Sequence, residues 1–358
     1  MRILLIASNQ STHSAKWGNS LVNRGHEIIF VSYPAPDRPS IRFDNRIIRH
    51  KLKFGGKLGY YLNVFEIRSL YKKYKPDVVA VHYASGFGTM ARLAGLRPLV
   101  ISCYGSDVFT YPYLNKFNMY NIRKNLSYAD AVGCTSEIMA IQTRKVMNNP
   151  NMKITVTPFG VDMTKFHPRG IKIVRDRPVI GIIKYLEPIY DIPLLIHAFA
   201  IIYNEMLKKP LLKIYGNGYL KDELVRLTQD LGIEEGVSFM GAIPNTDVPE
   251  ALGEMDIFVN SSKNESFGVN MVEAMACQIP IVATDTPGAR EVVEDGVSGF
   301  IMKDRNPETM AEHFRQLLND DTLRKKMGKA GYERACSLYD WDKNLTTIEQ
   351  LLSSVVNS

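Results

Sequence analysis

Long apolar runs, paired cysteines and clustered metal ligands are all missing from this 358-residue chain. No apolar run reaches the about 20 residues that a membrane helix needs, and the opening run of residues 1–7 is too short for the core of a signal peptide. The four cysteines, Cys103, Cys134, Cys277 and Cys336, are scattered without paired spacing. They argue against a disulfide framework or a zinc site, and they predict buried thiols in a reducing, cytoplasmic compartment.

Motifs for nucleic acids and for metals are scarce as well. We find no DNA- or RNA-binding motif and expect no nucleic-acid partner. One Asp-x-Asp motif, Asp340 to Asp342, opens a helical pattern over 341–356, so we interpret it as a helix cap and expect no bound metal. With 45% apolar and 23% charged residues the composition is that of a globular protein, and the length suits two domains.

Positive charge is concentrated in the first half of the chain. Residues 1–165 contain 23 Lys+Arg and 9 Asp+Glu, whereas the remainder contains 21 and 28. The basic residues between Arg38 and Lys75 are interleaved with phenylalanine and tyrosine, a composition that suits the headgroup level of a membrane. We therefore expect an anionic partner, such as a membrane surface or a diphosphate-bearing lipid acceptor, and a peripheral position on the inner face of the plasma membrane. An ordinary solvated helix face is the alternative.

Short β-branched segments alternate with helical patterns along the whole chain, which is typical of parallel sheets covered on both faces. We predict six strands in each half: 3–7, 27–32, 77–82, 99–102, 131–135 and 153–157, then 179–183, 211–215, 237–240, 256–259, 281–284 and 299–302. A segment rich in Pro and Gly at 161–177 predicts a linker between the two sets. The fold class is thus α/β, with two doubly wound, Rossmann-like domains over 1–165 and 166–340 and a terminal helix over 341–358 that packs back on the first domain.

The stretch from Glu265 to Glu273 carries the clearest chemical signal. It follows the strand 256–259 and contains Gly268, after which a helical pattern begins. A strand that ends in a glycine turn and opens a helix presents free backbone N–H groups at the positive end of the helix dipole, an arrangement that suits a phosphate. The two flanking carboxylates can accept hydrogen bonds from hydroxyls on either side, which describes a nucleotide sugar. The alternative is a capping carboxylate and one surface Glu.

Several further segments occur in a defined order around this stretch: 158–162, 215–218, 237–241, Gly288 and 291–293. With the spacing from Glu265 to Glu273, the chain resembles glycosyltransferase family 4, whose members are retaining enzymes of the GT-B fold with two domains facing a central cleft. Segments 14–17, 82–88, 104–107 and 184–190 resemble a subgroup from bacterial surface-polysaccharide pathways. The resemblance implies a metal-independent hexosyltransferase without a cofactor, which moves a sugar from a nucleotide-diphosphate donor, most often a UDP-sugar in this family, to a glycan or lipid-linked acceptor.

The resemblance assigns roles in the second, donor-binding domain. Glu265 approaches the sugar ring, and Glu273 binds the ribose hydroxyls. The departing diphosphate is stabilised by Lys184 and by backbone N–H groups. The further donor-binding residues that it implies are Ser266, Phe267, Gly268, Val269, Gly216 and Gly241.

In the first, acceptor-binding domain the candidates are His13, His82, Tyr104 and the catalytic candidate Asp107. Each lies at or shortly after the end of a predicted strand, at the edge of the sheet where ligands bind. The alternatives are a helix cap for Asp107, a core histidine for His82 and an ordinary loop residue for His13.

Three departures from the family leave other functions open. The loop 8–13 lacks the usual two glycines, Tyr104 replaces a common histidine, and the usual Arg and Lys pair is reduced to Lys184, with Tyr190 at the second position. A nucleotide-sugar epimerase of the same fold and an inactive nucleotide-sugar-binding or scaffold protein are therefore alternatives. A phosphorylase is less fitting, because it needs a pyridoxal cofactor and a longer chain.

Overall fold

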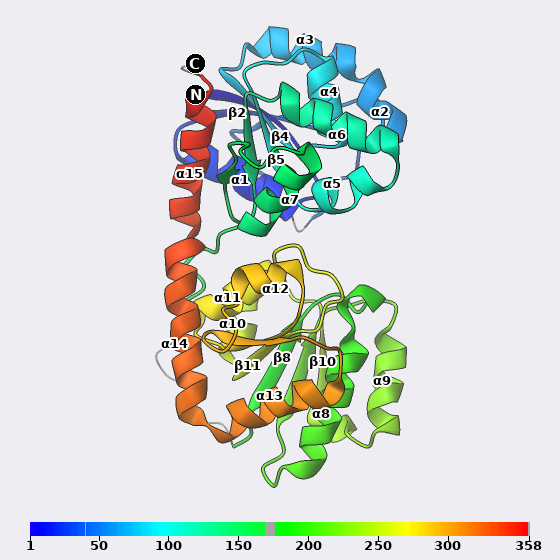
Figure 1. Cartoon of the computed structure of the whole chain (residues 1–358), viewed down its shortest axis with the longest axis vertical. Coiled ribbons are helices and arrows are strands. Elements are labelled where there is room, and N and C mark those ends of the chain that lie inside the picture. The colour runs from blue at the N-terminus through cyan, green and yellow to red at the C-terminus, as the bar shows by residue number, and fades with distance from the viewer. Residues whose placement is uncertain (40, 169–175, 357–358) are drawn as a thin grey trace. The chain divides into compact units, whose positions relative to one another are not determined.

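The computed structural model describes residues 1–39, 41–168 and 176–356, which form two compact units (Figure 1). The first unit combines Met1–Phe159 with Asp342–Ser358, and the second is Gly160–Trp341. The sequence placed this division after residue 165. It falls earlier because the backbone N–H of Val161 donates to Tyr339 O and the N–H of Trp341 donates to Val161 O, at 2.7 and 3.0 Å, which ties this segment to the second unit. Part of the predicted linker, 169–175, lies outside the described residues.

A parallel sheet of seven strands forms the centre of the first unit, in the order β3-β2-β1-β4-β5-β6-β7. The strands are β1 Arg2–Ile6, β2 Glu27–Ser32, β3 Ile48–Lys51, β4 Val78–His82, β5 Leu99–Cys103, β6 Ala131–Cys134 and β7 Thr155–Val156. The prediction of six strands was wrong by one, since it omitted β3. This strand has a single apolar residue and mostly exposed side chains because it lies at the edge of the sheet, so its sequence carries no buried-strand pattern.

The second unit has a parallel sheet of six strands in the order β10-β9-β8-β11-β12-β13. They are β8 Val179–Ile183, β9 Leu211–Tyr215, β10 Val237–Gly241, β11 Ile257–Asn260, β12 Ile281–Thr284 and β13 Gly299–Met302. All twelve predicted strands are present with ends within two residues of the prediction. In both sheets the strand order reverses once, between β1 and β4 and between β8 and β11. Ligands of doubly wound sheets bind beyond the carboxyl ends of the strands at such a switch point.

Helices cover both sheets. Those of the first unit are α1 Thr12–Asn23, α2 Gly56–Leu62, α3 Val64–Tyr74, α4 Gly86–Leu93, α5 Ser106–Phe109, α6 Lys116–Tyr128, α7 Glu137–Met147 and α15 Trp341–Ser354, which starts at the last residue of the second unit. Those of the second are α8 Ile192–Glu205, α9 Lys221–Asp230, α10 Val248–Gly253, α11 Val269–Ala276, α12 Pro287–Val292, α13 Pro307–Asn319 and α14 Asp321–Leu338. Three short 3-10 turns are η1 Tyr111–Tyr113, η2 Pro188–Tyr190 and η3 Glu234–Gly236. Within the described ranges we find no helix with the length and apolarity to cross a bilayer.

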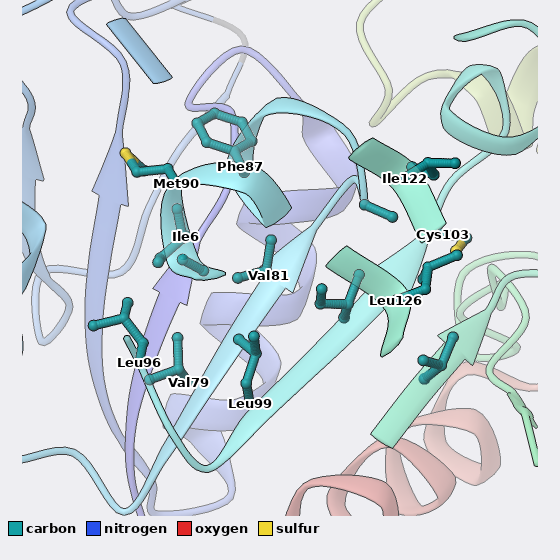
Figure 2. Packing of buried hydrophobic residues seen from close by; sticks show 14 of the residues in the cluster. Ile6, Val79, Val81, Phe87, Met90, Leu96, Leu99, Cys103, Ile122 and Leu126 are labelled. Atoms are coloured by element: carbon teal, nitrogen blue, oxygen red, sulfur yellow. The ribbon is translucent and has the colours of Figure 1, made fainter. Parts of the chain in front are cut away.

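One face of the first sheet packs against α3, α4, α6 and α7 through a continuous apolar core. Figure 2 shows part of it, where Val79 and Val81 of β4 lie between Met90 of α4 and Leu126 of α6. Cys103 and Cys134 are buried in this layer as predicted, whereas Cys277 and Cys336 are only half-buried. Parallel strands covered on both faces need such near-continuous apolar sequences, which is why their positions could be predicted.

The terminal helix α15 is part of the first unit. Its Glu349 carboxylate pairs with Arg24 and with His26 Nε2, the latter at 2.8 Å, and Asp342 accepts a second bond from Arg24 at 2.8 Å. Leu351 packs so closely over Gly133 of β6 that a Cβ at that glycine would lie 3.1 Å from the leucine methyl. The helix therefore completes the covering of the first sheet.

Candidate active site

Lys184 and Glu265 meet at the switch point of the second sheet. Lys184 directly follows β8, and Glu265 follows β11, the strand beside it. The Lys184 ammonium forms a close ion pair with the Glu265 carboxylate, and both side chains are largely buried, with exposures of 11% and 18%. The same ammonium lies 5.1 Å from the centre of the Tyr190 ring. Two candidates that are 81 positions apart in sequence thus form one charged centre.

A helix with an open positive end begins beside this pair. Gly268 immediately precedes α11 with a φ of +85°, a backbone conformation that glycine adopts without strain. The helix has no capping side chain and no acidic residue in its first turn, so none of its own first-turn side chains neutralises the positive end of its dipole. A Cβ at Gly268 would lie 2.3 Å from the Met271 methyl and 3.3 Å from Glu265 Cγ, so the turn is shaped for glycine.

The other residues of the motif fall into two groups. Phe267 is buried with its ring 5.5 Å from that of Tyr339 in an edge contact, so its side chain is part of the core of the second unit. Ser266, Val269 and Glu273 are half-buried, and Glu273 lies one turn into α11. The ribose contact of Glu273 stays a prediction.

A pocket of about 330 Å³ opens next to Lys184. It is formed by the carboxyl ends of β8, β9 and β10 and by α10, and its lining residues are Ile183, Lys184, Tyr185, Tyr190, Tyr215, Gly216, Asn217, Ala242, Ile243, Asn245 and Val248. Rings, aliphatic side chains and two amides line one concave space, which is the usual make-up of a small-molecule site.

The two remote glycines of the prediction both belong to this region. Gly216 lines the pocket, and its N–H donates to Gly241 O at 2.8 Å. Gly216 has a φ of +140°, and a Cβ there would lie 1.8 Å from Lys184 O, so no side chain is possible without moving the end of β8. The glycines therefore shape the pocket wall.

Sequence reasoning missed several polar groups at this switch point. Asn270 donates to Ile183 O at 3.0 Å and thereby fastens α11 to the end of β8, while its own carbonyl oxygen is buried without a protein partner. The amide nitrogen of Asn260, the last residue of β11, is also buried without one. Asn260 could have been singled out because it ends a strand beside the switch point, and Asn270 because it lies in the first turn of the helix α11 that follows the motif.

Two candidates of the first unit, His82 and Tyr104, form a buried pair. His82 ends β4, and its Nε2 lies 3.1 Å from the Tyr104 hydroxyl while its Nδ1 lies 3.5 Å from Ser14 Oγ. The Trp17 ring covers its edge at 4.6 Å. Burial, with a smaller contribution from His13, lowers the pKa of His82 to about 3, so the imidazole is neutral near pH 7. The position of His82 is consistent with a buried core histidine and also with a side chain that holds the Tyr104 hydroxyl in place.

His13 stacks on Phe159, with ring centres 3.9 Å apart. It was expected in the loop after the first strand, but it lies in the first turn of α1, because Ser11 caps the helix by accepting the N–H of Ser14. Burial, with a smaller contribution from Lys16, lowers the pKa of His13 to about 4, so this ring is neutral as well. Phe159 also contacts the Tyr104 ring, which brings His13, His82 and Tyr104 into one aromatic cluster.

Asp107 is buried and holds the backbone around this cluster. Its carboxylate accepts N–H bonds from Ala84 at 2.9 Å, from Gly105 at 2.8 Å and from Tyr104 at 3.1 Å. Burial raises its pKa, and the three bonds act in the opposite direction. These N–H groups precede α5 or belong to another loop, so the carboxylate is not a conventional helix cap. The geometry gives Asp107 the task of positioning Tyr104, and a direct part in the reaction stays a prediction.

In the part of the chain that the structure describes, no three His, Cys, Asp or Glu side chains gather closely enough to hold a metal ion. Asp342 of the single Asp-x-Asp motif is engaged with Arg24 in the first unit.

Known proteins match both units. The family model described as "Glycosyl transferase 4-like" matches residues 2–136, and the one described as "Glycosyl transferases group 1" matches residues 163–334. N-acetyl-alpha-D-glucosaminyl L-malate synthase of Bacillus anthracis is 26% identical over 95% of this chain and 92% of that protein. The capsular polysaccharide biosynthesis glycosyltransferase CapM of Staphylococcus aureus is 27% identical over 74% of this chain and 73% of its own length.

A solved structure shows the same fold. Anabaena HepE, crystallised in complex with UDP, superposes with a TM-score of 0.84 at 20% identity, covering 99% of this chain and 100% of HepE. The two parallel-sheet units are those of the GT-B fold, as the sequence predicted. Taken with the two family models, these findings place the chain in the group 1, family-4-like glycosyltransferases.

Proposed function

We propose that this glycosyltransferase transfers a hexose from a nucleotide-diphosphate sugar, with uridine as the base, to a glycan or lipid-linked acceptor in cell-surface polysaccharide synthesis. The transfer retains the configuration of the sugar and uses no metal ion or cofactor. The second unit binds the donor, and the first unit supplies contacts to the acceptor. CapM, a relative with a role in capsular polysaccharide synthesis, supports the proposed pathway class.

The observation that carries the proposal is the Lys184–Glu265 pair beside the open end of α11. When the sugar bond breaks, negative charge grows on the departing diphosphate. A lysine and an uncapped helix end, fixed before the reaction, stabilise that charge without rearranging, which is the largest single contribution in many enzymes. They take the place of a divalent cation in this proposal.

Glu265 has a second task on the sugar side. Its carboxylate is held by Lys184 and remains near the turn at Gly268, where it can accept hydrogen bonds from the sugar hydroxyls. A fixed negative charge there also favours the positive character that the sugar ring gains in the transition state. Glu273, on the same helix, binds the ribose hydroxyls in this proposal.

The pocket beside Lys184 suits the nucleobase. Its walls are aromatic and aliphatic, and Asn217 and Asn245 add amide groups that can pair with the edge of a base. Its volume of about 330 Å³ accommodates a pyrimidine ring with part of the ribose. The complex of HepE with UDP supports uridine as the base.

The test is nucleotide release from a panel of UDP-, GDP-, ADP- and dTDP-sugars, with and without a bacterial membrane-lipid extract. We expect release from a UDP-hexose that the extract enhances. NMR of the product should show the same anomeric configuration as the donor, and a chelator should leave the rate unchanged. No release from any donor, together with no thermal stabilisation by nucleoside diphosphates, would instead indicate a degenerate site and favour an inactive scaffold protein.

Two matched variants separate catalysis from folding. Glu265→Ala should abolish transfer while UDP still raises the melting temperature, because the base pocket is intact. Glu205→Ala removes a carboxylate from an ion pair with Arg315 elsewhere in the same unit, so it should transfer sugar at the wild-type rate. Wild-type transfer by Glu265→Ala would contradict the assignment.

A further inference from the structure

An apolar stripe lies exposed along α2 and α3. Phe54, Leu58, Tyr61, Leu62 and Phe65 follow one another at helical spacing, and all five are solvent-exposed. Leu58 retains 72% and Phe65 82% of its accessible surface. Helices of globular proteins normally turn such a stripe toward the core, so its outward direction indicates a partner.

A second apolar stripe extends from η1 into α6. Tyr113, Leu114, Phe117 and Tyr120 are each more than half exposed. Their spacing also places them on one side of their turn and helix. This stripe could not be recognised as a surface from the sequence, because the pattern of α6 as a whole is that of an ordinary helix covering a sheet.

The two stripes adjoin. The helix α4, whose residues 87–91 are buried, packs against both α2 and α6. Tyr60 of α2 and Tyr111 of η1 both pack against the apolar core to which α4 belongs. Burial is the main cause that raises the pKa of Tyr60, and the phenol of Tyr111 contributes in the same direction. We call the nine exposed side chains of the two stripes the apolar face; they are Phe54, Leu58, Tyr61, Leu62, Phe65, Tyr113, Leu114, Phe117 and Tyr120.

The apolar face is surrounded by positive charge. Residues 51–75 contain seven Lys+Arg and one acidic residue, Glu66, and residues 108–129 contain three Lys+Arg and no acidic residue. Lys57, Arg68 and Lys124 are among the exposed cations, and the Lys124 ammonium lies 5.5 Å from the centre of the Tyr120 ring. Glu66 is engaged by the backbone N–H of Lys53.

We propose that the apolar face docks on the surface of an anionic lipid bilayer. The leucines and phenylalanines enter the boundary of the acyl chains, and the tyrosines lie at headgroup level. The lysines bind anionic headgroups, and because this attraction is electrostatic, added salt weakens it. A second copy of the chain is a poorer occupant, because a two-fold contact over this face would set the same ring of cations against itself.

The position of the face connects it to the acceptor. The turn η1 follows α5, and α5 follows the end of β5, where Tyr104 and Asp107 lie. Only the short helix α5, which contains Asp107, thus separates the part of the apolar face on η1 from Tyr104 along the chain, so a docked bilayer would lie near both residues. This last step rests on the proposed function and favours a lipid-linked acceptor over a free glycan.

The test is co-sedimentation of the full chain with vesicles of phosphatidylcholine alone and of phosphatidylcholine with phosphatidylglycerol. We expect binding to the anionic vesicles that weakens with salt. Leu58→Glu with Phe65→Glu, and separately Leu114→Glu with Phe117→Glu, should each weaken it by about 100-fold, because two apolar anchors are lost and two repelling charges are added.

A matched control adds the same charge elsewhere. Leu207→Glu with Tyr219→Glu alters two equally exposed side chains of the second unit and should bind vesicles like the wild type. Equal vesicle binding by all variants, or none by the wild type, would overturn the proposal. A dimer in sedimentation velocity that the apolar-face variants dissociate would assign the face to a second copy instead. Vesicle binding needs no donor, so its outcome is independent of whether UDP-sugars are substrates.

Discussion

Replacement of Lys184 by methionine should separate the two roles of the Lys184–Glu265 pair. Methionine keeps much of the aliphatic stem but removes the ammonium, which leaves the Glu265 carboxylate largely buried without its cation. Removing one partner of a buried pair costs about 3–5 kcal/mol in full burial, and since both side chains retain some exposure we expect about 1–3 kcal/mol. Transfer should fall about 100- to 1,000-fold, the usual loss for one group that stabilises developing negative charge.

The double variant Lys184→Met with Glu265→Ala provides the decisive comparison. It removes the stranded carboxylate, so its free energy of unfolding, measured by urea denaturation, should recover to within about 1 kcal/mol of the wild type. Nucleotide release from the preferred donor should stay as low as in the worse single variant. Recovery of turnover together with stability would refute the catalytic reasoning, and additive losses of stability would refute the pairing.

Three further outcomes follow from the geometry of the two units. The pKa of His82 lies below that of an unfolded histidine, so at mildly acidic pH the unfolded chain binds a proton that the folded chain does not. The free energy of unfolding should therefore stay constant above about pH 6.5 and fall between about pH 6.5 and about pH 4. His82→Asn should reduce this dependence of the unfolding free energy on pH by up to about 1.4 kcal/mol per pH unit, measured by urea titrations. Gly216→Ala should destabilise the protein by about 3 kcal/mol or more and abolish thermal stabilisation by UDP, because the new Cβ would overlap Lys184 O. The control is Gly232→Ala, whose Cβ would meet no atom within 4 Å; it should cost about 1 kcal/mol and keep UDP binding. Asp107→Ala should cost about 3 kcal/mol or more, since three buried N–H groups lose their acceptor, and equal urea midpoints for this variant and the wild type would contradict the positioning role.

The fold could be predicted because buried parallel strands leave a clear sequence pattern. Every strand with both faces covered was found, from β1 in the interior of the first sheet to β13 at the edge of the second. The exposed edge strand β3 was missed because solvent imposes no apolar pattern on it. The start of α1 was missed for a related reason, since its Ser11 cap lies in a polar stretch that has the composition of a loop.

The candidate site could be predicted only in part. The motif from Glu265 to Glu273 is local, so its turn and helix follow from neighbouring residues. The pairing of Lys184 with Glu265 and the anchoring of Asn270 on Ile183 depend on which strands become neighbours in the sheet, and single residues do not reveal that. Of the three backbone bonds of Asp107, the one from the N–H of Ala84 likewise joins two loops that lie 23 positions apart.

Because its last helix follows the second unit in sequence, the first unit is discontinuous along the chain. During synthesis, the surface of β6 around Gly133 therefore remains exposed to solvent until all of Gly160–Trp341 has been made and α15 can cover it. A frameshift or nonsense codon shortly after residue 341 would therefore destabilise the first unit, because Glu349 would no longer pair with Arg24 and Leu351 would no longer cover the sheet. The second unit, which ends at Trp341, would keep all of its residues. Donor binding should then outlast such a truncation, while the apolar face and the acceptor residues would belong to a unit without its final layer.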